Sequence, residues 1–136
     1  MIAQVAQAIT QHYNASANLK DVLTGGLYFA QAPQDVSSPY AVFYFIGATH
    51  EEIMSSTSIN NIINVELQFN IFATNQDGGL MIASIAEILD ETFHWAEIHV
   101  DGYSRIKMQR QALLPVMYVD EIWQVSITYE LSFQQS

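Results

Sequence analysis

The sequence predicts one α+β domain in which two helices pack on a mostly antiparallel sheet. Residues 63–71 and 123–133 alternate strictly between apolar and polar side chains, which is typical of strands with one buried face. Residues 2–13 and 81–93 carry apolar side chains at helical spacing. A length of 136 residues suits a single hydrophobic core, so residues 1–136 are predicted to form one domain.

The N-terminal helix is expected to end at Gly25 and Gly26, because glycine is the residue that most readily closes a helix. Residues 27–31 follow as a short apolar run bounded by these glycines and by Pro33, which indicates a strand. The chain therefore enters the sheet directly after its first helix.

Residues 40–46 form the next predicted strand, opened by Pro39, where a missing N–H group is tolerated. This run is apolar without alternation, so one face should be covered by the core and the other by a helix or a neighbouring subunit. Residues 47–61 are polar and aperiodic, which predicts a mobile loop or a hairpin arm.

The C-terminal half supplies the other elements. Asp77 offers a cap for the second helix. The dipeptide Asp101-Gly102 predicts a hairpin across residues 98–109. Pro115 argues for an edge or bulged position. Connections of hairpin length favour antiparallel pairing, and exposed sheet edges could be paired between subunits.

The charge excludes one class of partner. The chain has fourteen acidic and four basic residues, for a net charge of −10. Nucleic-acid binding needs clustered Lys and Arg, and only Arg105, Lys107 and Arg110 lie near one another, so no stable nucleic-acid binding is expected. No segment approaches the roughly 20 apolar residues of a membrane span, so no membrane partner is expected either.

The sequence offers no motif for catalysis. His94 and His99 could converge on a metal with Asp101, but they lack ligand spacing, and surface histidines around a turn are favoured. Glu51 and Glu52 could bind a cation, although calcium needs several oxygens in a set spacing. We therefore expect no catalytic residue, no cofactor and no metal, and predict that the chain is not an enzyme.

The order and spacing of the elements resembles the tail terminator (tail completion) proteins of long-tailed bacteriophages. The resemblance covers essentially the whole chain and lies in a pattern of segments. These are the helix ending at Gly25-Gly26, the Leu27-Tyr28-Phe29 strand, the Ala32-Pro33 loop, the run from Ser38 to Phe43, the polar loop, the alternating strand over residues 63–72, the helix over residues 81–93 and the final alternating strand.

This resemblance implies a bacteriophage or prophage structural protein. Such a subunit assembles as a ring, commonly a hexamer, on the end of a finished tail tube, stops its polymerisation and provides the head-joining surface. The implied partners are further copies of the chain, the tail tube protein and a head–tail connector protein. The implied location is the virion tail, and the host bacterial cytoplasm during assembly. An acidic ring lumen would let DNA slide through.

The candidate interface follows from the strand that is apolar on both faces, since one of its faces is left for another subunit. The candidate subunit or partner interface, including the acidic pair of the polar loop, is Tyr40, Val42, Tyr44, Ile46, Glu51 and Glu52.

Two other functions stay open. A neck or head-closure protein of the same particles would share small size and acidity, and its partner would be a portal or adaptor ring. A small ligand-binding α+β domain would need a deep pocket, for which the candidate lining is Tyr28, Phe43, Phe45 and Trp123. Aromatic residues at strand spacing are more often core.

Overall fold

The computed structural model describes residues 2–54, 59–74 and 79–135, and within these ranges the chain forms three helices and six strands. The helices are α1 (Ile2–Asn14), α2 (Ala17–Val22) and α3 (Leu80–Phe93). The strands are β1 (Leu27–Phe29), β2 (Tyr40–Met54), β3 (Ile59–Ala73), β4 (Tyr103–Leu113), β5 (Met117–Val119) and β6 (Ile122–Gln135). The predicted α+β class is confirmed.

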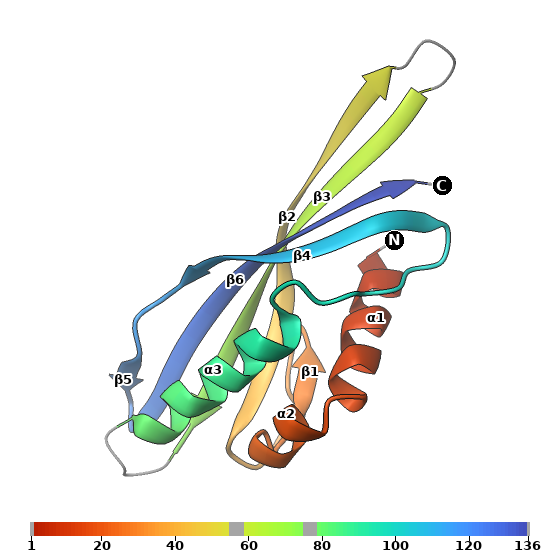
Figure 1. Cartoon of the computed structure of the whole chain (residues 1–136). Helices are drawn as coiled ribbons and strands as arrows, with labels where there is room; N and C mark the ends of the chain where they lie inside the picture. Colours follow the sequence, from red (N-terminus) through yellow and green to blue (C-terminus); the bar gives the residue numbers. More distant parts are fainter. Residues whose placement is uncertain (1, 55–58, 75–78, 136) are drawn as a thin grey trace.

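The strands form one sheet in the order β1-β2-β3-β6-β4, and β5 pairs with β6 beyond the end of β4. All neighbours are antiparallel except β1 and β2, which run parallel. The three helices lie on one face of the sheet (Figure 1). We call the other face the open face.

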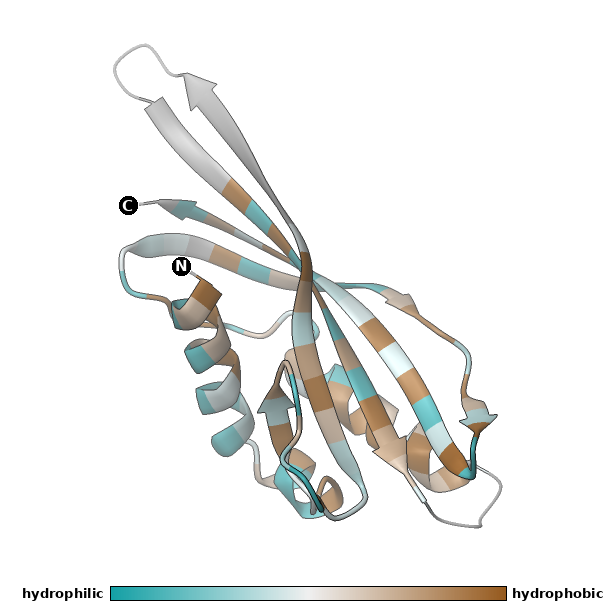
Figure 2. Cartoon of the chain, turned by 180° about the vertical axis from the view of Figure 1, so that it is seen from behind, coloured by the Kyte–Doolittle hydropathy of each residue, from teal (hydrophilic) through white to brown (hydrophobic). Residues whose placement is uncertain are grey.

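The core lies between the helices and the sheet, as the alternating patterns predict. On β3, Leu67 and Phe69 are fully buried, while Glu66 before them and Gln68 between them point to the open face. The ring centroid of Phe69 lies 4.9 Å from that of Phe93 on α3. Figure 2 looks onto the open face and shows apolar and polar residues alternating along the strands.

The link from α2 into the sheet requires glycine at position 25. The Gly25 N–H group donates to the Pro39 carbonyl oxygen at 2.7 Å, and a Cβ atom at this position would lie 1.7 Å from the Ser37 carbonyl oxygen. This contact places β1 beside β2 in a parallel register that begins with Leu27 opposite Ala41. The sheet is mostly antiparallel, as predicted, and β1–β2 is its parallel pair because residues 30–39 carry the chain back to the start of β2.

The prediction of a hairpin across residues 98–109 is wrong. Asp101-Gly102 does form a turn, in which the Tyr103 N–H group donates to the Val100 carbonyl oxygen at 3.2 Å. Ile98 and Val100 form no strand, and their side chains are buried in the core. The link before β4 therefore packs on the core, and β4 pairs with β6.

A hairpin that the sequence did not reveal joins β5 to β6. Its two turn residues, Asp120 and Glu121, have φ angles of 51° and 66°, as a tight two-residue hairpin turn requires. The signal was missed because Glu121 stands where such turns usually have Gly. Pro115 lies in the break between β4 and β5 at the sheet edge, in agreement with the edge position expected for it.

The polar segment 47–61 is paired as strand over much of its length. Residues 47–54 of β2 pair with residues 59–66 of β3, so the backbone matches the hairpin-arm alternative and the loop interpretation is wrong for these residues. A register shift between Phe45 and Gly47 marks where the arm begins, and the arm projects beyond the rest of the sheet (Figure 1). Residues 55–58 lie outside the described residues.

We expect the backbone amides of residues 48–54 to exchange hydrogen faster than those of residues 65–71 in the isolated subunit. The β6 strand pairs with β3 only as far as Ile62, so the outer arm is a two-stranded ribbon, which is marginally stable by itself. Hydrogen exchange resolved by residue measures this difference. Equal protection of the two segments in a monomer would show that the arm needs no partner.

Candidate assembly surface

Three of the predicted interface residues share a groove on the open face. Tyr40, Val42 and Tyr44 of β2 are half-buried and line an open groove of about 630 Å³, whose opposite wall is the loop over residues 30–38. Phe72 extends the apolar floor, since its ring stacks on that of Tyr40 with centroids 5.1 Å apart. The groove is a concave, largely apolar surface that nothing in the described chain fills.

The other predicted interface residues lie farther along β2. Ile46 stands at the β-bulge and is 47% exposed. Glu51 and Glu52 belong to the arm, where their backbones pair with Ile62 and Asn61 of β3, and their side chains lie outside the described residues. The structure thus gathers Tyr40, Val42 and Tyr44 in one groove and separates them from the acidic pair.

A second apolar surface was missed by the sequence reasoning. Six large apolar side chains in a row at the end of β4, in the following link and in β5 are between 40% and 56% exposed. We call them the apolar edge: Leu113, Leu114, Val116, Met117, Tyr118 and Val119. The available signal was an apolar run that does not alternate, and it was interpreted only as an edge strand.

The middle of the open face is polar and internally bonded. The Ser126 hydroxyl donates to the Asn70 side-chain oxygen at 2.7 Å, and the Gln68 amide donates to the same oxygen at 2.8 Å. Farther along the sheet, the Ser132 hydroxyl donates to the Asn64 side-chain oxygen at 2.6 Å. These bonds hold amide and hydroxyl groups in fixed positions between the groove and the arm.

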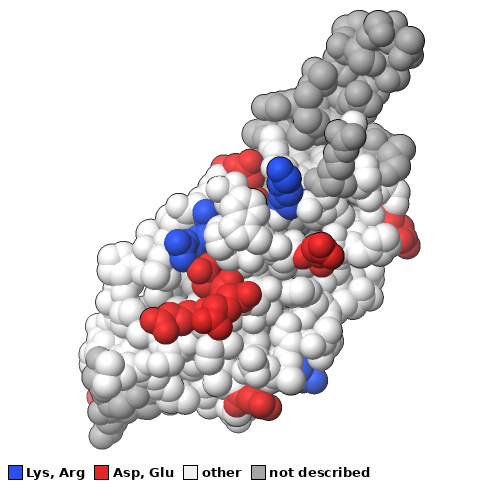
Figure 3. All heavy atoms as spheres, in the orientation of Figure 1, with Lys and Arg blue, Asp and Glu red and all other residues white. Residues whose placement is uncertain are grey.

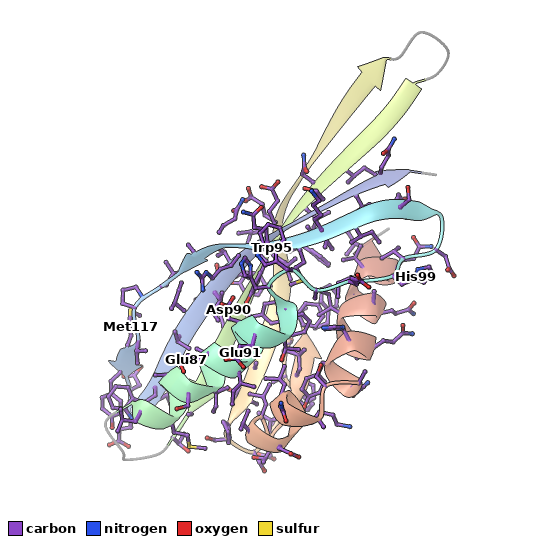
Figure 4. The ribbon with its side chains drawn as sticks, in the orientation of Figure 1. Glu87, Asp90, Glu91, Trp95, His99 and Met117 are labelled. Carbon is purple, nitrogen blue, oxygen red and sulfur yellow. The ribbon has the colours of Figure 1, made fainter. Side chains whose placement is uncertain are left out.

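An ion pair between Asp90 and Arg110 lies on the helix side of the sheet. Asp90 of α3 accepts a hydrogen bond from the Tyr129 hydroxyl at 2.8 Å and an ion-paired one from Arg110 at 2.7 Å. Burial, reinforced by the hydrogen bond to Asp90, raises the pKa of the Tyr129 phenol. Figure 3 shows acidic side chains gathered over α3, and Figure 4 identifies them as Glu87, Asp90 and Glu91.

Replacing Tyr129 with Phe should cost about 1–3 kcal/mol of stability at neutral pH, because Asp90 loses a buried hydrogen bond. The raised pKa keeps the folded-state phenol neutral above about pH 10, where an unfolded tyrosine ionises, so wild-type stability should fall from there upward. The stability of the Tyr129→Phe variant should fall less steeply with rising pH. Burial also raises the pKa of Tyr13, so the stability of the variant should keep some dependence on pH. Urea unfolding between pH 8 and 11 measures both, and equal slopes would contradict the assignment.

The histidines are used structurally where their side chains are described. His12 donates to the Thr92 carbonyl oxygen at 2.8 Å, His94 accepts from the Arg110 backbone N–H group at 3.0 Å, and exposed His99 contacts Asp101 at 3.0 Å. Among the side chains that the structure describes, no three acidic or histidine groups gather as they would around a metal ion.

The candidate ligand pocket is not assembled. Phe43 is fully buried in the core, the Tyr28 hydroxyl donates to the Gly25 carbonyl oxygen at 2.6 Å, and Trp123 packs against Tyr118 with ring centroids 4.6 Å apart. A second groove lies between α3 and residues 113–116. Neither this groove nor the open-face groove is lined by these aromatic residues or by Phe45. No helix in the described part of the chain is long and apolar enough to cross a bilayer.

Comparison with known proteins gives likeness in fold and none in sequence. No family model matches the chain, and no curated protein matches its sequence. A solved chain of the virion of a native gene transfer agent particle aligns with a TM-score of 0.64 at 14% identity, over 98% of this chain and 97% of that chain. The bacteriophage SPP1 gp17 protein aligns with a TM-score of 0.63 at 14% identity, over 96% and 91%.

The fold is shared along nearly the whole chain. The resemblance to phage tail terminator proteins that the sequence indicated is therefore confirmed in the fold. At 14% identity the likeness carries no individual contact residue across.

Proposed function

We propose that the chain is a structural tail terminator of a bacteriophage or prophage. Several copies form a ring, a hexamer by the family resemblance, on the end of the tail tube, where the ring stops polymerisation and joins the head connector. The observation that carries this proposal is the fold shared end to end with a virion chain and a bacteriophage protein. The ring acts in the virion tail and assembles in the host cytoplasm.

The open-face groove is the first surface through which we expect neighbouring subunits to meet. Tyr40, Val42 and Tyr44 present apolar surface that the subunit itself leaves half covered. Specific interfaces bury such surface, and a groove with a preformed wall accepts a segment of a neighbouring chain with little ordering cost. The arm offers a second contact, because its outer part pairs only within the hairpin.

The role requires no chemistry from the side chains. The titratable groups with described partners, Asp90, Arg110 and Tyr129 above all, satisfy one another. We propose a structural function rather than an enzymatic one. A neck or head-closure protein is the alternative, and the partner distinguishes the two.

We expect no micromolar binding to duplex DNA at physiological ionic strength. Of the clustered cations, Arg110 is paired with Asp90, and Lys107 lies opposite Ser132 of the open face while Arg110 lies opposite Tyr129 of the helix side. Lys107 and Arg110 therefore lie on opposite faces of the sheet and do not form one phosphate-binding patch. Fluorescence anisotropy with a labelled duplex, titrated at two salt concentrations, measures this. Tight binding would also remove the proposal that DNA slides through an acidic lumen.

Negative-stain imaging of the purified protein, alone and mixed separately with tail tubes and with portal rings, tests the proposal. The terminator function gives rings at tube ends. Binding to portal or adaptor rings but not to tube ends would assign the neck function instead.

A further inference from the structure

We infer that the apolar edge receives a second copy of this chain, and that the surface it contacts on that copy is the β1–β2 side of the sheet. This inference rests on the proposed ring. A ring needs a heterologous contact, in which two different patches of one chain meet. The described structure offers two such patches at opposite edges of one sheet.

The apolar edge is large enough for a protein partner. Its six side chains are each about half exposed, and because even an aromatic side chain covers only roughly 150–250 Å², together they present at most on the order of 600 Å². That is at the upper end of the largest apolar patch of a typical monomer, and close to the ~800 Å² that each partner buries in a standard interface. A patch of this size on a soluble subunit calls for a partner surface rather than a small ligand.

The shape of the apolar edge fits the same partner. Leu113, Leu114 and Val116 stand off α3 and leave a groove of about 350 Å³, which Ala83 and Ala86 line on the helix side together with Glu87, Asp90 and Arg110. Met117 projects from β5 at the margin of the sheet (Figure 4). An apolar side chain of a neighbour can enter this groove while the edge itself covers the surface around it.

The β1–β2 side supplies the matching apolar side chains. At this side β1 covers β2 only as far as Phe43, so in the described part of the chain no strand lies against the outer edge of β2 beyond that residue. Phe29 is 43% exposed and Ile46 is 47% exposed there. Neither these two residues nor the six of the apolar edge carry a charge, and in the adjoining groove Asp90 is already paired with Arg110.

Cysteine cross-linking tests the contact, because the chain has no cysteine of its own. Met117→Cys and Ile46→Cys are prepared separately, mixed one to one, assembled on tail tube ends and treated with a short bismaleimide. We expect a cross-linked dimer from the mixture and from neither variant alone. Ile2→Cys, an exposed isoleucine at the start of α1, is the matched control and should not cross-link to Met117→Cys.

Each outcome decides. A dimer from Met117→Cys alone would mean that the edge pairs with itself, which overturns the inference. Assembled wild-type protein on tube ends together with no dimer in the mixture also overturns it, and leaves the proposed function intact. Wild-type protein that stays monomeric on tube ends overturns the proposed function and this inference together.

Discussion

Val42→Asp should abolish ring assembly and tail capping while the subunit stays folded. The Val42 side chain lies in the open-face groove, half-buried in the subunit, so a carboxylate there keeps access to water in the monomer. A neighbour that covered the groove would desolvate an unpaired charge at a cost of several kcal/mol, which weakens assembly about 100-fold or more. Light scattering against concentration measures assembly, and circular dichroism measures folding.

Two matched variants separate the groove from general effects of charge and shape. Val42→Thr keeps the branched side chain and adds no charge, and it should assemble within about threefold of wild type. Gln109→Asp places the same charge on an exposed position of β4, and it should assemble as wild type does. Assembly of Val42→Asp at wild-type concentration would remove the groove from the interface.

Phe69→Ala should cost about 3–5 kcal/mol of unfolding free energy, the largest stability effect we expect from a single side chain. Phe69 is fully buried, and its ring meets those of Phe43, Phe93 and Tyr129 with centroids between 4.9 and 5.6 Å apart. The substitution opens a cavity where the helices meet the sheet. Urea denaturation of the isolated subunit measures the loss.

Phe72→Ala is the control on the same strand. Phe72 is half-buried on the open face, where its main ring contact is with Tyr40, so its removal should cost clearly less than that of Phe69. Equal losses would contradict the assignment of the two faces. If Phe69→Ala does not fold, Phe69→Leu gives the same comparison at a smaller cost.

The fold class and the core were predictable because they depend on local patterns. Alternation placed Leu67 and Phe69 inward on β3, and helical spacing placed Phe93 inward on α3, all as the structure has them. The predictions that were wrong concern whether a segment forms a strand and which strand it pairs with. Ile98 and Val100 are apolar both in a strand and in a buried link, so their sequence could not distinguish the two.

The candidate site was only partly predictable. The run over residues 40–46 indicated that one face of β2 packs in the core but did not decide which; the structure buries Ala41 and Phe43 and turns Val42 the other way. The groove depends on the loop over residues 30–38 lying beside that face, which no local pattern encodes. The apolar edge depends on β4 ending at Leu113 and on nothing in the described chain covering it, and that is a property of the tertiary fold.

Polymerisation of tail tube protein in the presence of this chain tests the central claim most directly. Tube lengths are measured by electron microscopy after the chain is added during growth, with Val42→Asp as the inactive control. A terminator should stop growth at substoichiometric amounts and leave a ring on one end of each tube. Tubes that grow to the same lengths with and without the wild-type chain, and that carry no ring, would contradict it.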